Sequence, residues 1–449
     1  MTNQPALLAH HCTEGGLNDR AVDYWLKAGQ QAIARYAMPE AVAQLQKGLD
    51  LLPSIPDGVA RKERELSLQI AIGHALIATK GEAAPEPGEA FARARHLCQQ
   101  LIRPVQLAPI LVGQFTSRLV RGELKQAEQH ANEIRELGEV LKQVRWKCAG
   151  SACSGDVCFW LGKFNQARVH LENALSFWDP KFRAQTWGVP QDLGVLILVY
   201  LSRTLLYLGY IEQARLRRDE ALGEARRDGL LPYALVFALS QSFILDKYQG
   251  VKSAKVMLRE ADELMDISRE HGFPQWFCVG RIQRGWCLGA MSQQPAEGLP
   301  LLLEGIEFWR SAGCNLALPA FFTLLAEVYE MAGEPRDGLN RLDEAAKLVE
   351  TTHERWNEAE MHRLRGTLLL SMHKQATAEE SYRLALAVAR RQSAKFWELR
   401  AALDLARLLR NQGKRTEARD LLAPVYGWFT EGFDTPVLQD AKALLDQLV

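Results

Sequence analysis

The residues with the greatest potential for chemistry do not form a known catalytic pattern. Gly413-Lys414-Arg415-Thr416 resembles part of a phosphate-binding loop, but no glycine lies five residues before Gly413 and Thr416 comes one place too late. We therefore expect these residues to form a turn between two helices. The patterns H-E-x-x-H and G-x-S-x-G are also missing from the sequence. The sequence thus predicts no catalytic residue.

The histidines and cysteines do not have the spacing of a metal site. His10 and His11 are adjacent, and neighbours on a helix point about 100° apart. Cys148, Cys153 and Cys158 follow at intervals of five residues, so their side chains do not converge on one helix face. None of the eight cysteines belongs to a C-x-x-C pair. We expect reduced, buried cysteines, no metal and no cofactor.

Two further groups of residues favour structure over ligand binding. The sequence has eleven tryptophans, and those near predicted helix starts have a repeat-like placement that favours packing: Trp25, Trp276, Trp356 and Trp397. Residues 390–419 hold nine Lys or Arg against three acidic residues. Nucleic-acid binding would require a continuous basic face with aromatic platforms or a groove-reading helix. We expect a solvated face, with an acidic protein partner as the alternative.

The elements that position these residues repeat along the chain. Gly366 and Ala378 lie twelve residues apart, and this pair of small residues recurs in most units. Two antiparallel helices cross closely only where neither carries a bulky side chain, so each pair predicts a helical hairpin. From Ala127 onward the second small residue recurs at spacings of 40, 47, 40, 42, 42, 40 and 40 residues. Glycines shortly before it predict the positive φ of a helix end.

Composition agrees with an all-helical protein. The 449 residues are 47% apolar, and 54 basic residues balance 54 acidic ones, so no bulk attraction to nucleic acid or anionic membrane is expected. The longest apolar run, Leu193 to Leu201, is far shorter than the roughly 20 residues that span a bilayer. Residues 1–16 show no signal peptide. We therefore expect a cytoplasmic protein without membrane contact.

The repeat resembles a known family. The spacings small-x₁₁-small and A-x₃-[LY]-x₂-A resemble the tetratricopeptide repeat (TPR) over residues 19–430, although the units are longer than that family's usual ones. Residues 7–32 and 389–448 are similar to the C-terminal repeat region of bacterial proteins that join a class III adenylate/guanylate cyclase to an AAA-type ATPase. The chain has neither the cyclase metal-binding aspartates nor a Walker motif, so the resemblance provides no catalytic residue.

The resemblance implies an all-α fold, a right-handed α-solenoid of about ten TPR-like hairpins with a C-terminal capping helix. We divide the chain into a lead-in at 1–18, a repeat array at 19–430 and a capping helix at 431–449. Irregular segments are expected at 53–60, 80–88 and 179–192.

Tetratricopeptide arrays present the inner helix of each hairpin on a concave face, which places a candidate binding surface. The positions eight, eleven and fifteen residues before the small residue of each second helix are expected to face this groove. The charged residues that we select as candidates among them are Asp156, Arg203, Asp246, Glu327, Glu330, Arg363, Arg407 and Arg410. A groove would keep them solvated until a protein or peptide binds. The alternative is that they only solvate the inner face.

These observations favour a non-catalytic scaffold for protein–protein interaction or regulatory sensing, associated with cyclase/ATPase signalling. One alternative is enzyme-like: a fragment with residual adenylate/guanylate cyclase function, assigned by its membership of that family. The other is a ligand-sensing repeat module of a transcriptional regulator. The sequence leaves the partner and the oligomeric state open.

Overall fold

The chain folds into a series of antiparallel helix pairs. The computed structural model describes residues 4–184, 187, 189–227 and 232–448, and these form 22 α-helices and no β-strand. A first helix, α1 (Pro5–Glu14), precedes the pairs, and α22 (Pro436–Gln447) follows them. The five pairs of the N-terminal half are α2 (Asn18–Ala34) with α3 (Met38–Leu51), α4 (Val59–Lys80) with α5 (Pro85–Leu101), α6 (Pro104–Val120) with α7 (Leu124–Leu141), α8 (Val144–Trp160) with α9 (Phe164–Phe177), and α10 (Leu193–Leu208) with α11 (Ile211–Ala225).

Five further pairs make the C-terminal half. They are α12 (Pro232–Gln249) with α13 (Ala254–His271), α14 (Pro274–Trp286) with α15 (Pro295–Ser311), α16 (Leu318–Met331) with α17 (Pro335–Thr352), α18 (Glu358–Ser371) with α19 (Gln375–Arg391), and α20 (Lys395–Asn411) with α21 (Arg415–Tyr426). Short helical turns lie at Leu52–Ser54, Pro180–Ala184 and Cys287–Met291. The prediction of a right-handed α-solenoid of about ten TPR-like hairpins is therefore confirmed. Residues 185, 186 and 188 of the predicted insertion lie outside the described residues.

Close helix contacts form where the sequence places small residues. A Cβ on Gly338 would lie 3.2 Å from the carbonyl oxygen of Ala326, twelve residues earlier. A Cβ on Gly366 would lie 2.5 Å from the ring of Tyr382. The space above this glycine is therefore filled by the large residue four positions after Ala378, which explains why the two types of residue recur together.

Glycines end most of the inner helices, as the sequence indicates. Gly209 follows α10 with a φ of 97°, and Gly413 follows α20 with a φ of 84°. A left-handed conformation of this kind is readily adopted only by glycine. Gly413 and Lys414 accordingly lie in the turn between α20 and α21, as predicted, whereas Arg415 and Thr416 begin α21.

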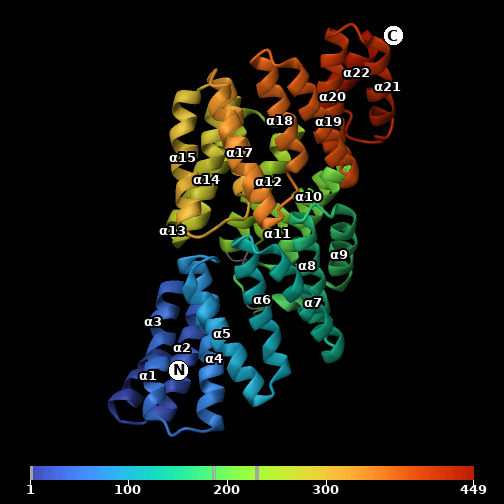
Figure 1. Cartoon of the computed structure of the whole chain (residues 1–449). Helices are drawn as coiled ribbons and strands as arrows, with labels where there is room; N and C mark the ends of the chain where they lie inside the picture. Colours follow the sequence, from blue (N-terminus) through green and yellow to red (C-terminus); the bar gives the residue numbers. More distant parts are fainter. Residues whose placement is uncertain (1–3, 185–186, 188, 228–231, 449) are drawn as a thin grey trace.

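The solenoid winds tightly enough for its two turns to touch. The Val120 carbonyl at the end of α6 accepts hydrogen bonds of 3.0 Å from the backbone N–H groups of both Asn315 and Leu316, just before α16. The Trp160 carbonyl accepts a 2.8 Å bond from the Arg355 N–H, just before α18. Each contact joins hairpins five positions apart. We call α2–α11 the first turn and α12–α21 the second turn. Figure 1 shows α16–α18 above α6–α8, and the two chain ends at opposite ends of the molecule.

Aromatic side chains fill the contact between the turns. Tyr207 of the first turn stacks on Trp397 of the second with 4.8 Å between ring centroids, and Phe159 stacks on Trp356 at 5.8 Å. Trp397 Nε1 also donates a 2.9 Å hydrogen bond to the Trp356 carbonyl. Because the core is continuous across the turns, the second turn is held by the first as well as by its neighbouring hairpins.

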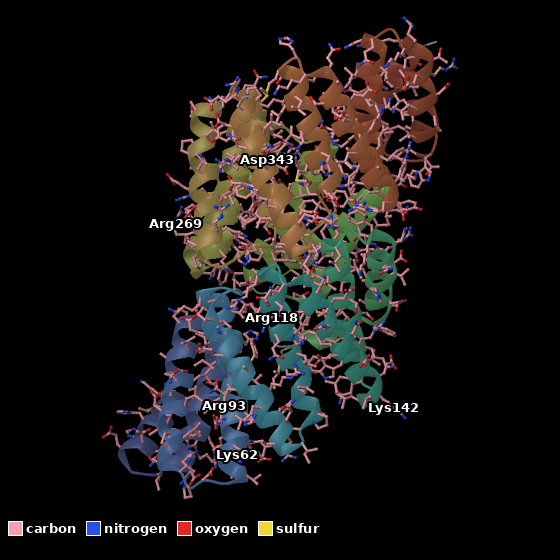
Figure 2. The ribbon with its side chains drawn as sticks, in the orientation of Figure 1. Lys62, Arg93, Arg118, Lys142, Arg269 and Asp343 are labelled. Carbon is pink, nitrogen blue, oxygen red and sulfur yellow. The ribbon has the colours of Figure 1, made fainter. Side chains whose placement is uncertain are left out.

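Charged side chains cover the outer surface, where they pair within and between helices (Figure 2). Arg93 bonds Glu65 at 2.6 Å, and Arg269 bonds Asp266 at 2.8 Å. The basic residues of 390–419 also find acidic partners outside that segment, since Arg391 pairs with Glu358 at 3.3 Å. The segment is therefore less basic than its own sequence indicates.

The predicted buried residues are buried. All eight cysteines are free, and all except Cys12 lie in the interior. The four tryptophans expected to pack, Trp25, Trp276, Trp356 and Trp397, are each 7% exposed or less. No helix in the described part of the chain is both long and apolar enough to cross a bilayer.

We expect Ala378→Leu to lower the free energy of unfolding by roughly 1–3 kcal/mol, because Ala378 is fully buried between α18 and α19 and leaves no room for three more carbons. Ala376→Leu, on an exposed position of the same helix, is the control. Thermal unfolding measures both. Equal midpoints for the two variants would contradict the close approach.

Candidate functional site

Three of the eight predicted concave residues lie in the interior. Asp156 on α8, Arg203 on α10 and Asp246 on α12 are 3%, 2% and 1% exposed. The sequence predicted a groove that keeps such residues solvated. Because the second turn rests directly on the first, the inner face is instead closed here. Asp246 is paired with Arg218 and, at 2.8 Å, with Lys252.

The other five lie on the inner helices of the second turn. Glu327 and Glu330 are on α16, Arg363 is on α18, and Arg407 and Arg410 are on α20. The exposed fraction of the side chain rises along this row, from 13% at Glu327 and 12% at Arg363 to 42% at Arg407. The binding role of all eight residues stays a prediction.

Ion pairs hold Glu327, Arg363 and Arg407 of this row. Glu327 contacts Lys247 at 2.8 Å, and Lys247 lies 4.0 Å from the centroid of the Tyr248 ring. Arg363 contacts Asp404 at 2.6 Å, and Asp404 contacts Arg407 at 3.2 Å. The row is therefore a structural network, in which only the C-terminal end is open to solvent.

Glu360 is the centre of this network. Its side chain is fully buried and lies 2.8 Å from Arg363 and 2.7 Å from Arg400. Burial alone would raise the pKa of Glu360, but the charges of the two arginines outweigh burial and lower this pKa far below its usual range. Glu360 is therefore ionised at every physiological pH.

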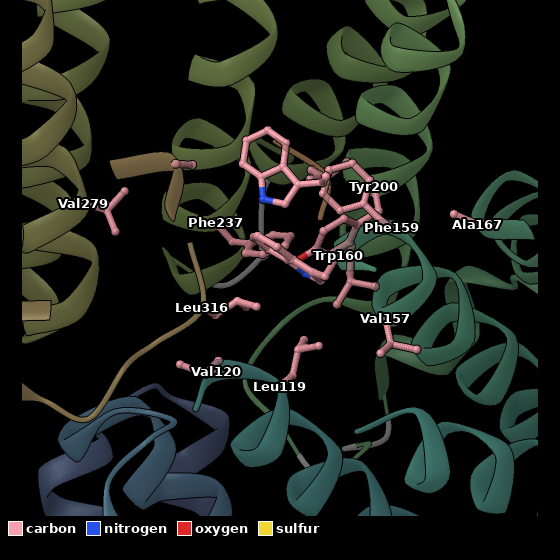
Figure 3. Packing of buried hydrophobic residues seen from close by; sticks show 14 of the residues in the cluster. Leu119, Val120, Val157, Phe159, Trp160, Ala167, Tyr200, Phe237, Val279 and Leu316 are labelled. Carbon is pink, nitrogen blue, oxygen red and sulfur yellow. The ribbon is translucent and has the colours of Figure 1, made fainter. Parts of the chain in front are cut away.

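A cavity of about 100 Å³ lies between the two turns, and we call it the inter-turn chamber. Its walls are the inner helices α6, α8 and α10 of the first turn, α12, α14 and α16 of the second, and further residues at 82, 187, 189, 191, 316, 317 and 356. Figure 3 shows Trp160, Tyr200 and Phe237 gathered with Leu119 and Leu316 around this region. The walls are thus aromatic and come from parts of the chain that are distant in sequence.

Arg203 brings a positive charge into the chamber wall. One of its terminal nitrogens, Nη1, donates to Oε1 of Gln241. Its guanidinium carbon lies 4.3 Å from the ring centroid of Phe159 and 4.7 Å from that of Trp356. These rings attract the cation through their π faces. The guanidinium is therefore held in place by an amide and by aromatic rings.

Three buried carboxyl groups lie in or near the chamber. Asp156 accepts a 2.9 Å hydrogen bond from Trp160 Nε1. Glu82 accepts a 3.1 Å bond from the Tyr233 hydroxyl, and Glu354 accepts a 2.7 Å bond from Trp356 Nε1. Burial raises the pKa of each of the three to about 7, although these hydrogen bonds lower it in part. Near neutral pH these groups are therefore only partly ionised.

The chamber includes two of the predicted residues, Asp156 and Arg203, while the other six do not line it. The sequence prediction missed Gln241, which lies on an inner helix at none of the three chosen positions. It also missed Glu82 and Glu354, which lie in turns between helices, where no periodic pattern marks them. Trp356 had been assigned to packing, and it both packs and lines the chamber.

The chamber does not have the donor set of a metal site. Within the described residues, no group of three or more His, Cys, Asp or Glu side chains converges to hold an ion. The carboxyl groups bond aromatic N–H and hydroxyl groups instead of facing one another. The arrangement is suited to binding a molecule by shape and charge.

Comparison with known proteins supports the fold. No protein-family model matches the chain. An uncharacterized protein of Rhizobium meliloti (strain 1021) is 24% identical over 377 residues, which is 80% of this chain and 35% of that protein. The chain therefore spans about a third of that relative's length.

Solved structures of helical-repeat proteins are similar to this one. A Rap protein complexed with Competence and Sporulation Factor matches with a TM-score of 0.60 and 15% identity, covering 83% of this chain and 98% of the other. Human IFIT1, solved as a dimer with PPP-AAAA, has a TM-score of 0.44 and 14% identity, with 95% and 90% covered. The Rap match shows a shared TPR-like α-solenoid. The TM-score with IFIT1 is too low to support a conclusion.

Proposed function

We propose that the chain is a non-catalytic regulatory module that senses a ligand in the inter-turn chamber. The observation that carries this proposal is that the chamber walls come from both turns of the solenoid. A ligand there contacts the first turn through Tyr200 and the second through Trp276. Occupancy therefore favours one relative position of the two turns, which is how a binding event changes the shape of a scaffold.

The module would act on a partner domain of the cyclase/ATPase type. The support is the similarity of residues 7–32 and 389–448 to the repeat region of cyclase–ATPase fusion proteins, together with a relative of which the matched region is only 35%. The proposed contact surface is the open end of the charged row, where Arg407 and Arg410 are partly exposed. A guanidinium there can bind a partner's carboxylate with two hydrogen bonds.

A second candidate is the sensing module of a transcriptional regulator. The same enclosed chamber favours it, because a ligand pocket is equally useful to such a protein. The two candidates differ in their partner. Isolation of the chain from its native cell, followed by mass spectrometry, would identify a cyclase or P-loop ATPase polypeptide in the first case and a helix-turn-helix polypeptide in the second. Arg407→Ala with Arg410→Ala should reduce the recovery of that partner.

Sensing itself is tested on the chain alone. We expect native mass spectrometry of the chain, isolated without denaturation, to show an added mass that is lost on unfolding. We also expect neither ATP hydrolysis nor cyclic nucleotide formation, because no phosphate loop and no paired metal carboxylates are found in the sequence. Turnover that co-purifies with the chain and scales with its amount would contradict the non-catalytic assignment, and a chain that never carries a ligand would contradict sensing.

A further inference from the structure

Arg203 is a buried cation without an acidic partner. Its side chain is 2% exposed, and no carboxylate among the described residues forms an ion pair with it. Its Nε–H has no hydrogen-bond acceptor. The hydroxyl of Tyr207 lies beside the guanidinium and does not complete a hydrogen bond of normal geometry. A charge removed from water in this way is costly unless a counter-charge is supplied.

The rings around Arg203 compensate only part of this cost. Phe159 and Trp356 attract the cation through their faces, but a ring face does not replace the planar acceptor that a guanidinium prefers. Gln241 accepts a hydrogen bond from one N–H of Arg203, whereas a guanidinium has five N–H donors. Arg203 therefore keeps the capacity to bind an anion at the wall of the chamber.

The neighbouring acidic groups do not fill this role. Asp156 accepts a hydrogen bond from Trp160. Glu354 accepts one from Trp356 and another, of 2.9 Å, from the Ala317 N–H. Burial raises the pKa of both carboxyl groups to about 7, although the charge of Arg203 lowers it in part, so each carries only part of a negative charge at neutral pH. The positive charge of Arg203 is consequently only partly balanced by its surroundings.

The rest of the chamber is suited to a flat apolar group. Trp160, Trp276, Trp309 and Phe237 contribute aromatic walls. The volume of about 100 Å³ is smaller than the roughly 150 Å³ apolar cavity that accommodates benzene in an engineered protein, so a ligand with no more than one ring is expected, and the walls must move apart slightly to admit it. A strongly hydrated inorganic anion would lose its hydration water here, and these apolar walls would offer no hydrogen bonds in exchange. A ring that carries one carboxylate satisfies both parts of the site.

We propose that the inter-turn chamber binds a small aromatic carboxylate, with its carboxylate on Arg203 and its ring against the aromatic walls. This inference rests on the proposed function, in which the chamber receives a ligand, and it names the chemical class of that ligand. Arg203 acts in it as the residue that selects for negative charge.

A ligand series on the unaltered chain tests this selection. Isothermal titration calorimetry at pH 7 compares benzoate with benzamide, its neutral counterpart, and with benzylamine, its cationic one. We expect benzoate to bind at least about tenfold more tightly than benzamide, because a charge-assisted pair to Arg203 is lost with the amide. Benzylamine should not bind. Equal affinities for benzoate and benzamide, no binding of benzoate, or tightest binding of benzylamine would each overturn the inference.

A variant tests whether the carboxylate of benzoate binds to Arg203. Arg203→Met keeps most of the length of the side chain without its charge. It should lower the affinity for benzoate about tenfold or more and change the affinity for benzamide little. Arg217→Met, at a side chain of α11 that is 40% exposed and does not line the chamber, should leave both affinities unchanged. If Arg203→Met binds benzoate as tightly as the unaltered chain, Arg203 is a structural residue only and the inference is wrong. If that variant does not fold, the ligand series on the unaltered chain decides.

Different results would contradict the two proposals, that the chain senses a ligand and that this ligand is an aromatic carboxylate. If native mass spectrometry shows a neutral or cationic ligand on the unaltered chain, and benzoate does not displace it, the aromatic carboxylate is overturned and sensing stays in place. A chain that carries no cellular ligand, but binds benzoate through Arg203, would support the chemistry of the site and count against its use as a sensor.

Discussion

Glu360→Gln is expected to lower the free energy of unfolding by roughly 3–5 kcal/mol. Glu360 is fully buried and pairs with both Arg363 and Arg400. The amide keeps the shape of the side chain but removes its charge, so two buried guanidinium groups lose their shared counter-ion. Arg363 keeps Asp404 as a partner at 2.6 Å, whereas Arg400 forms no other ion pair among the described residues. Urea denaturation followed by circular dichroism measures the loss.

The pH dependence of this difference follows from the pKa of Glu360. In the folded chain the two arginines outweigh burial and hold this pKa well below its unfolded value of about 4.3. A depressed carboxyl pKa stabilises the fold above the unfolded pKa, and this contribution is lost as pH falls toward the folded pKa. The advantage of the unaltered chain over Glu360→Gln should therefore be complete at pH 6–7 and decrease below about pH 4.

A surface ion pair provides the matched control. Asp343 pairs with Arg365 on the outer surface, and its side chain is 57% exposed (Figure 2). Asp343→Asn should cost no more than about 1 kcal/mol, because water replaces the lost partner. If Glu360→Gln were no more destabilising than Asp343→Asn, the buried network would not contribute as proposed.

The sequence predicts the hairpins well, because the physical cause of each lies in the sequence itself. Gly338 and Gly366 mark close helix contacts, and glycines such as Gly209 mark helix ends. These signals are local and periodic. The hairpin count and the fold class follow directly from them.

The closure of the inner face has no comparable signal. The turns meet through backbone groups, such as the Val120 carbonyl and the Arg355 N–H, and a backbone group is present at every position whatever the side chain. How far the solenoid advances in five hairpins depends on small angles between many helices. The inner position of Arg203 could therefore be predicted, whereas its burial could not.

The composition of the chamber was predictable only in part. Asp156 and Arg203 recur at one repeat position, eleven residues before a small residue, and this marks them as inner-face residues. Glu82 and Glu354 lie in turns and reach the interior only because the turns of the solenoid stack. A charged residue in an otherwise well-formed turn has many possible roles, so the sequence does not distinguish these two from solvated residues.

The contact between the turns should be sensitive to a single aromatic residue, Trp397. This side chain is 1% exposed, stacks on Tyr207 of the first turn, and meets Tyr248 edge-on at 4.7 Å. We expect Trp397→Ala to lower the free energy of unfolding by roughly 3–5 kcal/mol, since the large cavity left behind cannot collapse between two stacked turns. Phe308→Ala, at a ring 42% exposed on α15, is the control and should change stability little.

The same variant tests whether the turns unfold together. In a solenoid whose repeats contact only their neighbours, stability is a sum of local terms and a change at α20 weakens the adjacent hairpins alone. Here Trp397 also holds the first turn, so its loss should separate the unfolding of the C-terminal hairpins from that of the rest. Hydrogen exchange should show faster exchange in α18–α22 and also at Tyr207 and its neighbours on α10. Faster exchange confined to α18–α22, with α10 unchanged, would show that the two turns are energetically independent and that a ligand between them could not couple them.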